Sequence, residues 1–303
     1  MINLLKKFKN VLTGNATVQH NDTNSIYLRS ENVQIKLFGP NISDTFKLLS
    51  NREVSYDFKS LINGSLKEYE FLSNEFNNCN DTIIIELPKI KIGVDNYSNH
   101  IVNYAYIFDG NLWTTNSHYL LKTDLHINHD VKMSIPAQVF NLFKKEKVWI
   151  GKKDNIVQIC GNIDAKNQIV IQYKELELKE LDKYISMLKN VSKPLDTCDD
   201  GIIYNLTEIT DLKLSSKRME NLIRYNDGLI SVFDNKFKYN VNEFKHDFEN
   251  KLKKFTIDAY YLKMFKKLFK KANIKTLGTL SGRTTSITMH DTDNSLLLMC
   301  ISE

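Results

Sequence analysis

Hydrophobic and polar positions near the C-terminus predict one helix followed by three strands. Residues 254–257 alternate as in a short strand, and residues 258–272 place apolar side chains at helical spacing. Three more strand-like runs follow, at residues 274–278, 283–289 and 295–301. The segment is therefore predicted to form a β-α-β-β-β unit, in which one helix packs on the face of a small antiparallel sheet.

The same order of elements is predicted at residues 131–174. A strand at residues 131–135 is followed by a helix at residues 136–145, and Pro136 suits the first turn of that helix. Strands follow at residues 147–150, 156–160 and 168–173. Two copies of one pattern in the same order indicate that the chain repeats this unit.

The N-terminal part of the chain fits the unit in outline. A helix at residues 4–12 precedes strands at residues 25–29, 33–38 and 45–49. A second unit begins with a strand at residues 53–56 and a short helix at residues 58–62, and its strands lie at residues 68–72, 82–87 and 89–94. No helix is predicted directly ahead of the meander that follows, whose strands lie at residues 101–108, 111–115 and 118–123.

The last third of the chain begins with a short helix near residues 181–188 and a polar linker at residues 193–202. The unit before the C-terminal one is predicted to have a helix at residues 216–224 and strands at residues 209–214, 229–233 and 236–239. In all, the β-α-β-β-β pattern fits about five of six possible stretches.

Length limits how these units can be grouped. A chain of 303 residues is long enough for two or three domains of about 100–150 residues each. We predict an α+β protein with three domains, at residues 1–95, 96–192 and 203–303, the last two joined by the linker at residues 193–202. Two larger domains, residues 1–190 and 203–303, are the alternative.

Composition excludes several classes of protein. The chain is 42% hydrophobic and 25% charged, and it contains no apolar run of about 18 residues, so no membrane span is expected. Its N-terminus lacks the pattern of a signal peptide. The four cysteines, Cys79, Cys160, Cys198 and Cys300, form no Cys-x-x-Cys pair. We therefore expect a reducing compartment, with neither a disulfide framework nor a zinc knuckle.

Two motifs in the middle of the chain resemble segments of a known protein family. Residues 109–121, Asp-Gly-Asn-Leu-Trp-Thr-Thr-Asn-Ser-His-Tyr-Leu-Leu, are similar to a middle-domain segment that ends in Ala-Thr-Asp-Gly-His-Arg-Leu in bacterial members of the DNA sliding clamp family. Thr115, His118 and Leu120 match that motif. The positions that depart from it are Asn116, Ser117 and Tyr119. About a dozen residues further on, residues 134–143 resemble the Ile-Pro strand-to-helix step of the family at the expected spacing.

The C-terminal strand carries the third part of the resemblance. Residues 296–303 are similar to the closing strand of the family, which ends in Met-Pro-Met-Arg-Leu. Met299 matches this ending, whereas Cys300 and Glu303 replace its proline and its final leucine. The resemblance covers the chain from about residue 100 onward better than the part before it.

The resemblance implies a DNA clamp fold, with antiparallel sheets outside and helices lining a ring. It implies that the ring encircles double-stranded DNA without reading its sequence and tethers the replicative DNA polymerase as a processivity factor. The implied partners are DNA, DNA polymerase, a clamp loader and further copies of the chain, in a homodimer for three domains or a homotrimer for two. Neither a catalytic residue nor a cofactor is implied. The expected location is the cytoplasm, of the host cell if a phage or virus encodes the chain.

A clamp needs a positively charged inner wall that attracts phosphates through weak, salt-screened contacts. Lysine suits this wall because its flexible point charge does not fix one register. The clearest candidate is the predicted terminal helix, where lysines recur at i, i+3, i+4, i+7 and i+8 with no acid after Asp258. For the other lysines, a solvated helix face is the alternative. The predicted DNA-binding residues are Lys6, Lys7, Lys9, Lys144, Lys145, Lys217, Arg218, Arg224, Lys263, Lys266, Lys267, Lys270 and Lys271.

The resemblance also implies a pocket for short peptide motifs of the polymerase and the clamp loader. An apolar groove with a flexible methionine suits such peptide anchors. A plain buried strand is the alternative for residues 296–301. The implied pocket residues are Thr115, His118, Leu120, Leu297, Met299, Cys300 and Ile301.

The main rival is a virus-encoded metal-dependent nuclease or another DNA-binding enzyme. His126 and His129 could bind a transition metal, but they lack the His-Glu-x-x-His arrangement, and a solvated loop is the alternative. Asp291 and Asp293 could act as paired carboxylates, although Asn294 beside them favours a hairpin turn. The cluster that would hold the metal is His118, Asp124, His126, His129 and Asp130. A β-rich structural or adaptor protein is a third hypothesis.

Overall fold

The computed structural model of the chain describes residues 17–22, 25–29, 33–40, 83–88, 90, 92–93, 100–127, 131–143, 147–153, 155–162, 168–196, 202–205, 214, 217–226, 228–245, 254–265, 268–269, 271–280 and 283–301. By contacts between residues, the chain divides into two compact units. Unit 1 comprises Met1–Leu87 and Ile127–Asp182, and unit 2 comprises Pro88–His126 and Lys183–Glu303.

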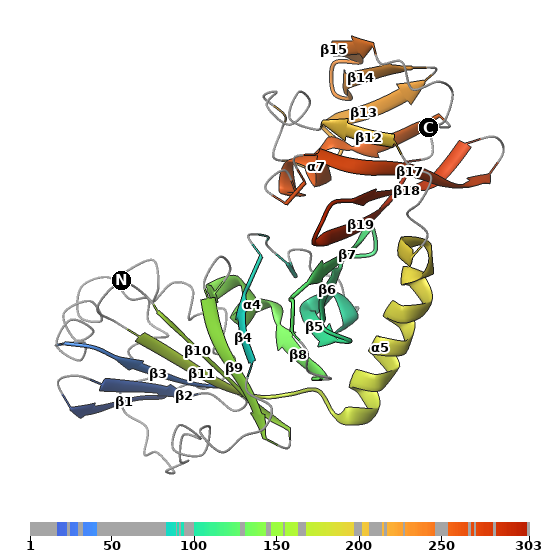
Figure 1. The fold of residues 1–303 in the computed structure, drawn as a ribbon. Coiled ribbons are helices and arrows are strands. Elements are labelled where there is room, and N and C mark those ends of the chain that lie inside the picture. Colours follow the sequence, from blue (N-terminus) through green and yellow to red (C-terminus); the bar gives the residue numbers. More distant parts are fainter. Residues whose placement is uncertain are drawn as a thin grey trace. The chain divides into compact units, whose positions relative to one another are not determined.

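Unit 1 is built on one sheet of antiparallel strand pairs, in the order β1-β2-β3-β11-β10-β9-β4 (Figure 1). The strands are β1 Thr17–Asp22, β2 Ser25–Arg29, β3 Val33–Phe38, β4 Ile83–Glu86, β9 Lys147–Lys153, β10 Ile156–Asn162 and β11 Gln168–Lys174. Segments far apart in the sequence meet where β3 pairs with β11, from Val33↔Tyr173 to Phe38↔Gln168. This pairing joins the N-terminal strands to the unit predicted at residues 131–174.

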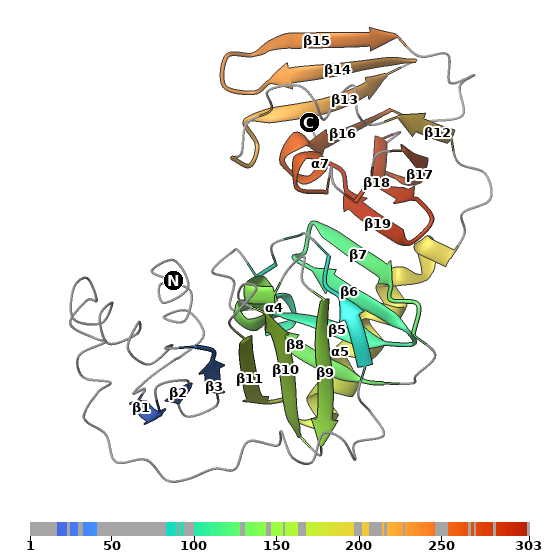
Figure 2. The same ribbon diagram turned by 60° about the vertical axis from the view of Figure 1, so that its left-hand side comes forward.

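The β-α-β-β-β order predicted at residues 131–174 is confirmed as β8-α4-β9-β10-β11. Strand β8 is Met133–Pro136, and helix α4 is Ala137–Phe143, which lies beside β10 and β11 in Figure 2. Gly161 of β10 approaches α4 so closely that a Cβ atom there would lie 2.8 Å from the Phe143 ring. Because both the ring and the strand are buried, any larger residue would force one of them to shift.

A buried polar network holds the step from β8 into α4. Glu175 accepts a hydrogen bond from the backbone N–H of Ser134 at 2.5 Å and forms an ion pair with Lys152, also at 2.5 Å. Lys152 also donates a hydrogen bond to the carbonyl oxygen of Lys132 at 2.9 Å. The Tyr173 hydroxyl donates a hydrogen bond to the carbonyl oxygen of Ser134 at 2.9 Å. Burial raises the pKa of Glu175, while the Lys152 ammonium and the Ser134 donor oppose that rise.

This network predicts a pH-dependent difference between the wild type and a Glu175→Gln variant. A carboxyl group whose pKa is raised in the folded state contributes stability that is fully present below its unfolded pKa and is lost as the pH rises through the folded pKa. The ordinary value for this group is 4.5. The free energy of unfolding of the wild type minus that of the variant should therefore fall as the pH rises from about 4 to 8. Urea unfolding at several pH values measures it, and a difference that stays constant or grows would contradict the assignment.

Unit 2 contains two sheets. In one, the strands of this unit lie in the order β12-β17-β18-β19-β7-β6-β5, and the other has the order β15-β14-β13-β16 (Figures 1 and 2). The strands of the first are β5 Tyr104–Phe108, β6 Asn111–Thr115, β7 Tyr119–Asp124, β12 Ile202–Asn205, β17 Lys271–Leu280, β18 Arg283–His290 and β19 Asn294–Met299. Those of the second are β13 Asn221–Asn226, β14 Leu229–Asp234, β15 Tyr239–Lys245 and β16 Phe255–Asp258.

Two helices cover opposite faces of the first of these sheets. Helix α7, Ala259–Phe265, packs on one face, where the rings of Phe265 and Tyr119 meet edge to face at 4.9 Å. Helix α5, Leu178–Ser192, packs its Tyr184 on Tyr106 of the other face, with ring centres 6.1 Å apart. Tyr106 on β5 pairs with Trp113 on β6, and Trp113 pairs with Lys122 on β7, so these three side chains share one face. Because side chains alternate along a strand, Tyr119, three residues before Lys122 on β7, points to the opposite face.

The predicted C-terminal unit is confirmed in its order, β16-α7-β17-β18-β19, but its helix is shorter than predicted. Helix α7 ends at Phe265, whose carbonyl oxygen accepts hydrogen bonds from the N–H groups of Leu268 and Phe269. Strand β17 already begins at Lys271, which pairs with Asn205. Pairing with β12 and β18 supplies backbone partners that a continued helix could not use, so the predicted helical end at residue 272 is wrong.

The helix predicted at residues 216–224 is also wrong. Residues 217–220 form a turn in which Met219 has a φ of 62°, and its N–H donates to the Asp258 carboxylate at 3.0 Å. From Asn221 onward the chain is strand β13, held between β14 and β16. The spacing of Met219, Leu222 and Ile223 is typical of one face of a helix. The backbone hydrogen bonds to both neighbouring strands nevertheless determine the conformation.

The remaining predictions meet mixed outcomes. Strands predicted at residues 25–29, 33–38, 82–87, 111–115, 118–123, 156–160, 168–173 and 229–233 are confirmed with small shifts at their ends. The strand predicted at residues 101–108 is confirmed only from Tyr104 onward, because His100–Asn103 form a 3₁₀ helix. The strand at residues 236–239 is wrong, because the Asp234 carboxylate accepts hydrogen bonds from the N–H groups of Lys236 and Phe237 and forms a turn there. The elements predicted at residues 4–12, 45–49, 53–56, 58–62 and 68–72 lie outside the described residues, as does the strand predicted at residues 209–214 except for Leu214.

The connection after β11 is more regular than predicted. Helix α5 is longer than the predicted 181–188 and continues into the 3₁₀ helix η5, Lys193–Asp196. A second 3₁₀ helix, η4 His100–Asn103, precedes β5. No helix within the described ranges is long and apolar enough to cross a membrane.

Candidate protein-binding pocket and basic residues

An apolar cavity of about 230 Å³ lies in unit 2 between the sheet and helix α5. Its floor is a row of paired residues on one face of the sheet, Thr115↔Leu120 and Leu120↔Leu297. The β6–β7 turn forms one edge, where the Asn116 side-chain oxygen accepts hydrogen bonds from the N–H groups of His118 and Tyr119. The lining residues are Ile101, Val102, Thr115, Ser117, Tyr119, Leu120, Met187, Leu188, Val191, Leu297 and Met299.

The cavity brings together four of the seven residues for which a pocket role was predicted. Thr115, Leu120 and Leu297 form its floor, and Met299, with 47% of its surface exposed, stands at its edge. The backbone N–H of Met299 donates to the carbonyl oxygen of His118 at 2.9 Å, which ties the end of β19 to the β6–β7 turn. The segment at residues 109–121 and the C-terminal strand, which both resemble clamp motifs, therefore meet in space through the β7–β19 pairing.

The other three predicted pocket residues lie outside the lining. The backbone N–H groups of Cys300 and Ile301 donate to Thr285 and Thr256, and burial raises the pKa of the Cys300 thiol to about 12. His118 turns toward Arg218, whose Nη2 lies 2.7 Å from its Nε2. Because an arginine can only donate, this contact requires His118 to accept at Nε2.

Helix α5 supplies a wall that the sequence motifs did not indicate. Met187, Leu188 and Val191 recur at i, i+1 and i+4, so they share one face of the helix. Met187 and Val191 are 45% and 54% exposed, which is unusual for an amphipathic helix that packs its apolar face on a sheet. The periodicity was visible in the sequence, but that spacing is equally typical of a helix buried in a core.

The turn before β13 holds two of the predicted DNA-binding residues. Lys217 is exposed, and its Nζ lies 3.5 Å from a carboxylate oxygen of Glu220. Arg218 contacts His118 and lies over the Tyr261 ring, 5.7 Å from its centre. Both residues are thus engaged by side chains of their own unit, Lys217 at an exposed position and Arg218 at a half-buried one.

The basic stripe predicted on the terminal helix is divided between different elements. Lys263 is on α7 and donates from Nζ to the carbonyl oxygen of Leu214 at 2.6 Å, whereas Lys271 begins strand β17. Arg224 is on β13 rather than on a helix, and its guanidinium lies 3.5 Å from the centre of the Phe233 ring. The other predicted DNA-binding residues lie outside the described residues: Lys6, Lys7, Lys9, Lys144, Lys145, Lys266, Lys267 and Lys270.

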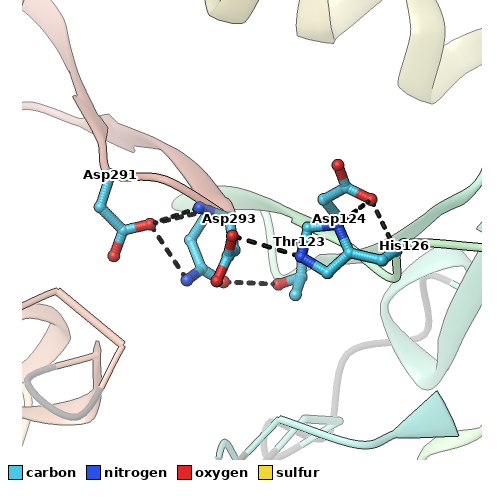
Figure 3. A network of polar contacts seen from close by, with 6 residues as sticks. Thr123, Asp124, His126, Asp291 and Asp293 are labelled. Atoms are coloured by element: carbon cyan, nitrogen blue, oxygen red, sulfur yellow. Dashed lines mark hydrogen bonds and ion pairs between the residues drawn. The ribbon is translucent and has the colours of Figure 1, made fainter.

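The described members of the proposed metal site, His118, Asp124 and His126, are not gathered into one metal-binding group. Figure 3 shows the two ring nitrogens of His126 facing different carboxylates, with Nδ1 3.6 Å from Asp124 and Nε2 3.3 Å from Asp293. Asp291 accepts hydrogen bonds from the N–H groups of Asp293 and Asn294, which makes the β18–β19 connection a hairpin turn. Within the described part of the chain no three potential metal ligands form a group, and His129 and Asp130 lie outside that part.

Comparisons with known proteins identify the fold. No protein-family model matches the chain, and no curated protein matches it. Solved structures do match, among them a DNA polymerase III beta chain from Streptococcus pneumoniae, with 14% identity and a TM-score of 0.57. DnaN sliding clamps from Pseudomonas aeruginosa and Bartonella birtlesii match with 10% and 9% identity and TM-scores of 0.58 and 0.62. Each alignment covers 100% of this chain and 97% of the other.

The chain therefore has a DNA sliding clamp fold, which confirms both the predicted α+β class and the resemblance found in the sequence. The solved clamps to which it is similar are beta subunits of bacterial DNA polymerase III. The likeness extends over the whole chain, including the N-terminal third, where the sequence motifs were weakest.

Proposed function

We propose that the chain is a sliding clamp, a homo-oligomeric ring that encircles double-stranded DNA and serves as a processivity factor for a DNA polymerase. The observation that carries this proposal is the fold match along the full chain, which spans 97% of each of the clamps compared above. Such a protein acts by topology and by binding partners, so it makes and breaks no bond. It would work in the cytoplasm, where the DNA and its polymerase are.

We infer three domains, at residues 1–95, 96–192 and 203–303, from the repeated units of the sequence and from the match to sliding clamps along the full chain. With three domains, two copies of the chain would close a ring, so we propose a homodimer. Strand β15 is a candidate for the contact between copies, because it ends the sheet β15-β14-β13-β16 and no described strand pairs with its outer edge. Tyr239 and Val241 lie on β15, Phe237 lies on the turn before it, and all three are exposed. They line a surface cavity of about 560 Å³.

The apolar cavity in unit 2 is the proposed site for partner peptides of the polymerase and the clamp loader. Its lining includes two half-exposed methionines, whose flexible side chains adapt to different apolar anchors. A cavity of about 230 Å³ accommodates one or two apolar side chains of a peptide rather than a folded surface. This matches a partner that is captured through a short motif.

The function is tested by retention on DNA of different topology. The protein, incubated at low salt with a nicked circular plasmid, is expected to co-elute with the plasmid in gel filtration and to be released when the plasmid is cut once. A ring slides off a free end, whereas a protein held by phosphate contacts alone stays on linear DNA. Without DNA the protein should elute as a multiple of 35.2 kDa. Equal retention on cut and uncut plasmid would contradict the proposal.

A further inference from the structure

We propose that the pocket selects peptides with acidic residues next to their apolar anchor, and that Lys122 and Lys183 bind those acidic residues. The inference rests on the proposed peptide-binding role of the pocket and adds a chemical class of partner to it. It follows from the register of the sheet and from the course of helix α5.

The sheet places Lys122 at one end of the pocket. The floor row is Thr115↔Leu120 and Leu120↔Leu297, and the next row on the same face contains the pairs Trp113↔Lys122 and Ser295↔Lys122. Residues two apart on a strand are about 6.5–7 Å apart along it. The Lys122 ammonium is held 5.4 Å from the centre of the Trp113 ring. It therefore lies within one side-chain length of the apolar floor.

Helix α5 places Lys183 at the same end. Tyr184 packs on Tyr106, and Tyr106 belongs to the row that includes Trp113 and Lys122. Lys183 adjoins Tyr184 in the sequence and lies one helical turn before Met187 of the pocket wall, so its Cα is about 6 Å from that of Met187. Its side chain is exposed. The two lysines thus flank one end of the cavity, one from the strand side and one from the helix side.

The charge at this end is available for a partner. Neither Lys122 nor Lys183 has a carboxylate partner among the described residues, while nearby acidic side chains are engaged. The Asp109 carboxylate lies 2.6 Å from Lys189, and that of Asp124 lies 3.6 Å from His126. The sequence neighbour of Lys183, Asp182, lies 3.9 Å from Lys132. No described residue of the cavity lining is charged. A peptide with an apolar anchor and an adjacent carboxylate therefore complements both the apolar floor and the two lysines at its end.

The experiment compares three fluorescein-labelled nonapeptides by anisotropy, all with a central Leu-Leu-Phe. One carries two aspartates on the N-terminal side of that centre, one carries them on the C-terminal side, and one has asparagines in their place. One of the two acidic peptides is expected to bind about threefold to tenfold more tightly than the neutral peptide at 50 mM salt, a preference that should shrink at 300 mM salt. The double variant Lys122→Gln/Lys183→Gln should lose the preference and keep its affinity for the neutral peptide. Lys254→Gln, at an exposed lysine directly before β16, is the control and should keep both the preference and the affinity for the neutral peptide.

Each other result has a definite meaning. Equal affinity of all three peptides at 50 mM salt, or a preference that survives in the double variant, would overturn the inference and leave the peptide pocket in place. Failure of the neutral peptide and of both acidic peptides to bind would overturn the peptide pocket itself, and the inference with it.

Discussion

The double variant Phe237→Asp/Val241→Asp is expected to elute as a monomer of 35.2 kDa and to lose retention on circular DNA. Phe237 and Val241 are 65% and 44% exposed, so a carboxylate at either position stays hydrated in a single chain. In a contact along β15 the same carboxylates would be buried without a partner, which costs about 3–5 kcal/mol in typical interfaces. A cost of that size weakens association by about a hundredfold to a few thousandfold. Size-exclusion chromatography with light scattering measures the change directly.

The control for this variant is Met219→Asp. Met219 is also an exposed apolar residue, at 41%, and it lies in the turn before β13 with a positive φ that aspartate tolerates. It should remain oligomeric and keep its retention on DNA. Circular dichroism of both variants separates loss of assembly from loss of fold. A β15 variant that stays oligomeric would show that another surface joins the copies.

The second large effect is expected at the pocket. Met187→Glu should reduce binding of the neutral Leu-Leu-Phe nonapeptide by about a hundredfold, because the apolar anchor would then share its cavity with a carboxylate that has lost its water. The free protein should fold normally, since Met187 is 45% exposed and glutamate has a high helix propensity. Fluorescence anisotropy measures the affinity, and the temperature of thermal unfolding checks the fold.

Ser186→Glu is the matched control for the pocket. Ser186 is the preceding residue of α5, is exposed and does not line the cavity. The same charge at this position should leave the affinity for the neutral peptide within about twofold. An equal loss in both variants would indicate a general electrostatic effect, and unchanged binding in Met187→Glu would place the peptide site elsewhere.

The order of elements was predictable because the spacing of apolar residues within each segment indicates whether it forms a helix or a strand. In the segment from Met133 to Lys174 the change from period 2 to period 3.6 and back lies within one stretch of chain, and the structure follows it as β8-α4-β9-β10-β11. The C-terminal unit was predictable for the same reason, from Phe255 to Met299. The helix predicted at residues 216–224 was wrong because its apolar spacing fitted both conformations. At Asn221–Asn226 the decision came from β14 and β16, whose hydrogen-bonding groups belong to other parts of the chain.

The candidate site shows the same division. The motif around Thr115 and the C-terminal strand around Met299 pointed to one surface, and the β7–β19 pairing joins them there. Sequence alone placed His118 in the pocket, whereas the structure turns it toward Arg218.

By itself the sequence determined the repeating unit, the α+β class and the clamp resemblance, because these depend on residue types at fixed local spacing. Only the tertiary structure decided that α5 closes the pocket with Met187 and Val191, that α7 ends at Phe265, and that the row containing Lys122 borders the cavity. These features depend on which distant strands supply hydrogen bonds and which faces they bury. Such information belongs to pairs of segments and is absent from either segment alone.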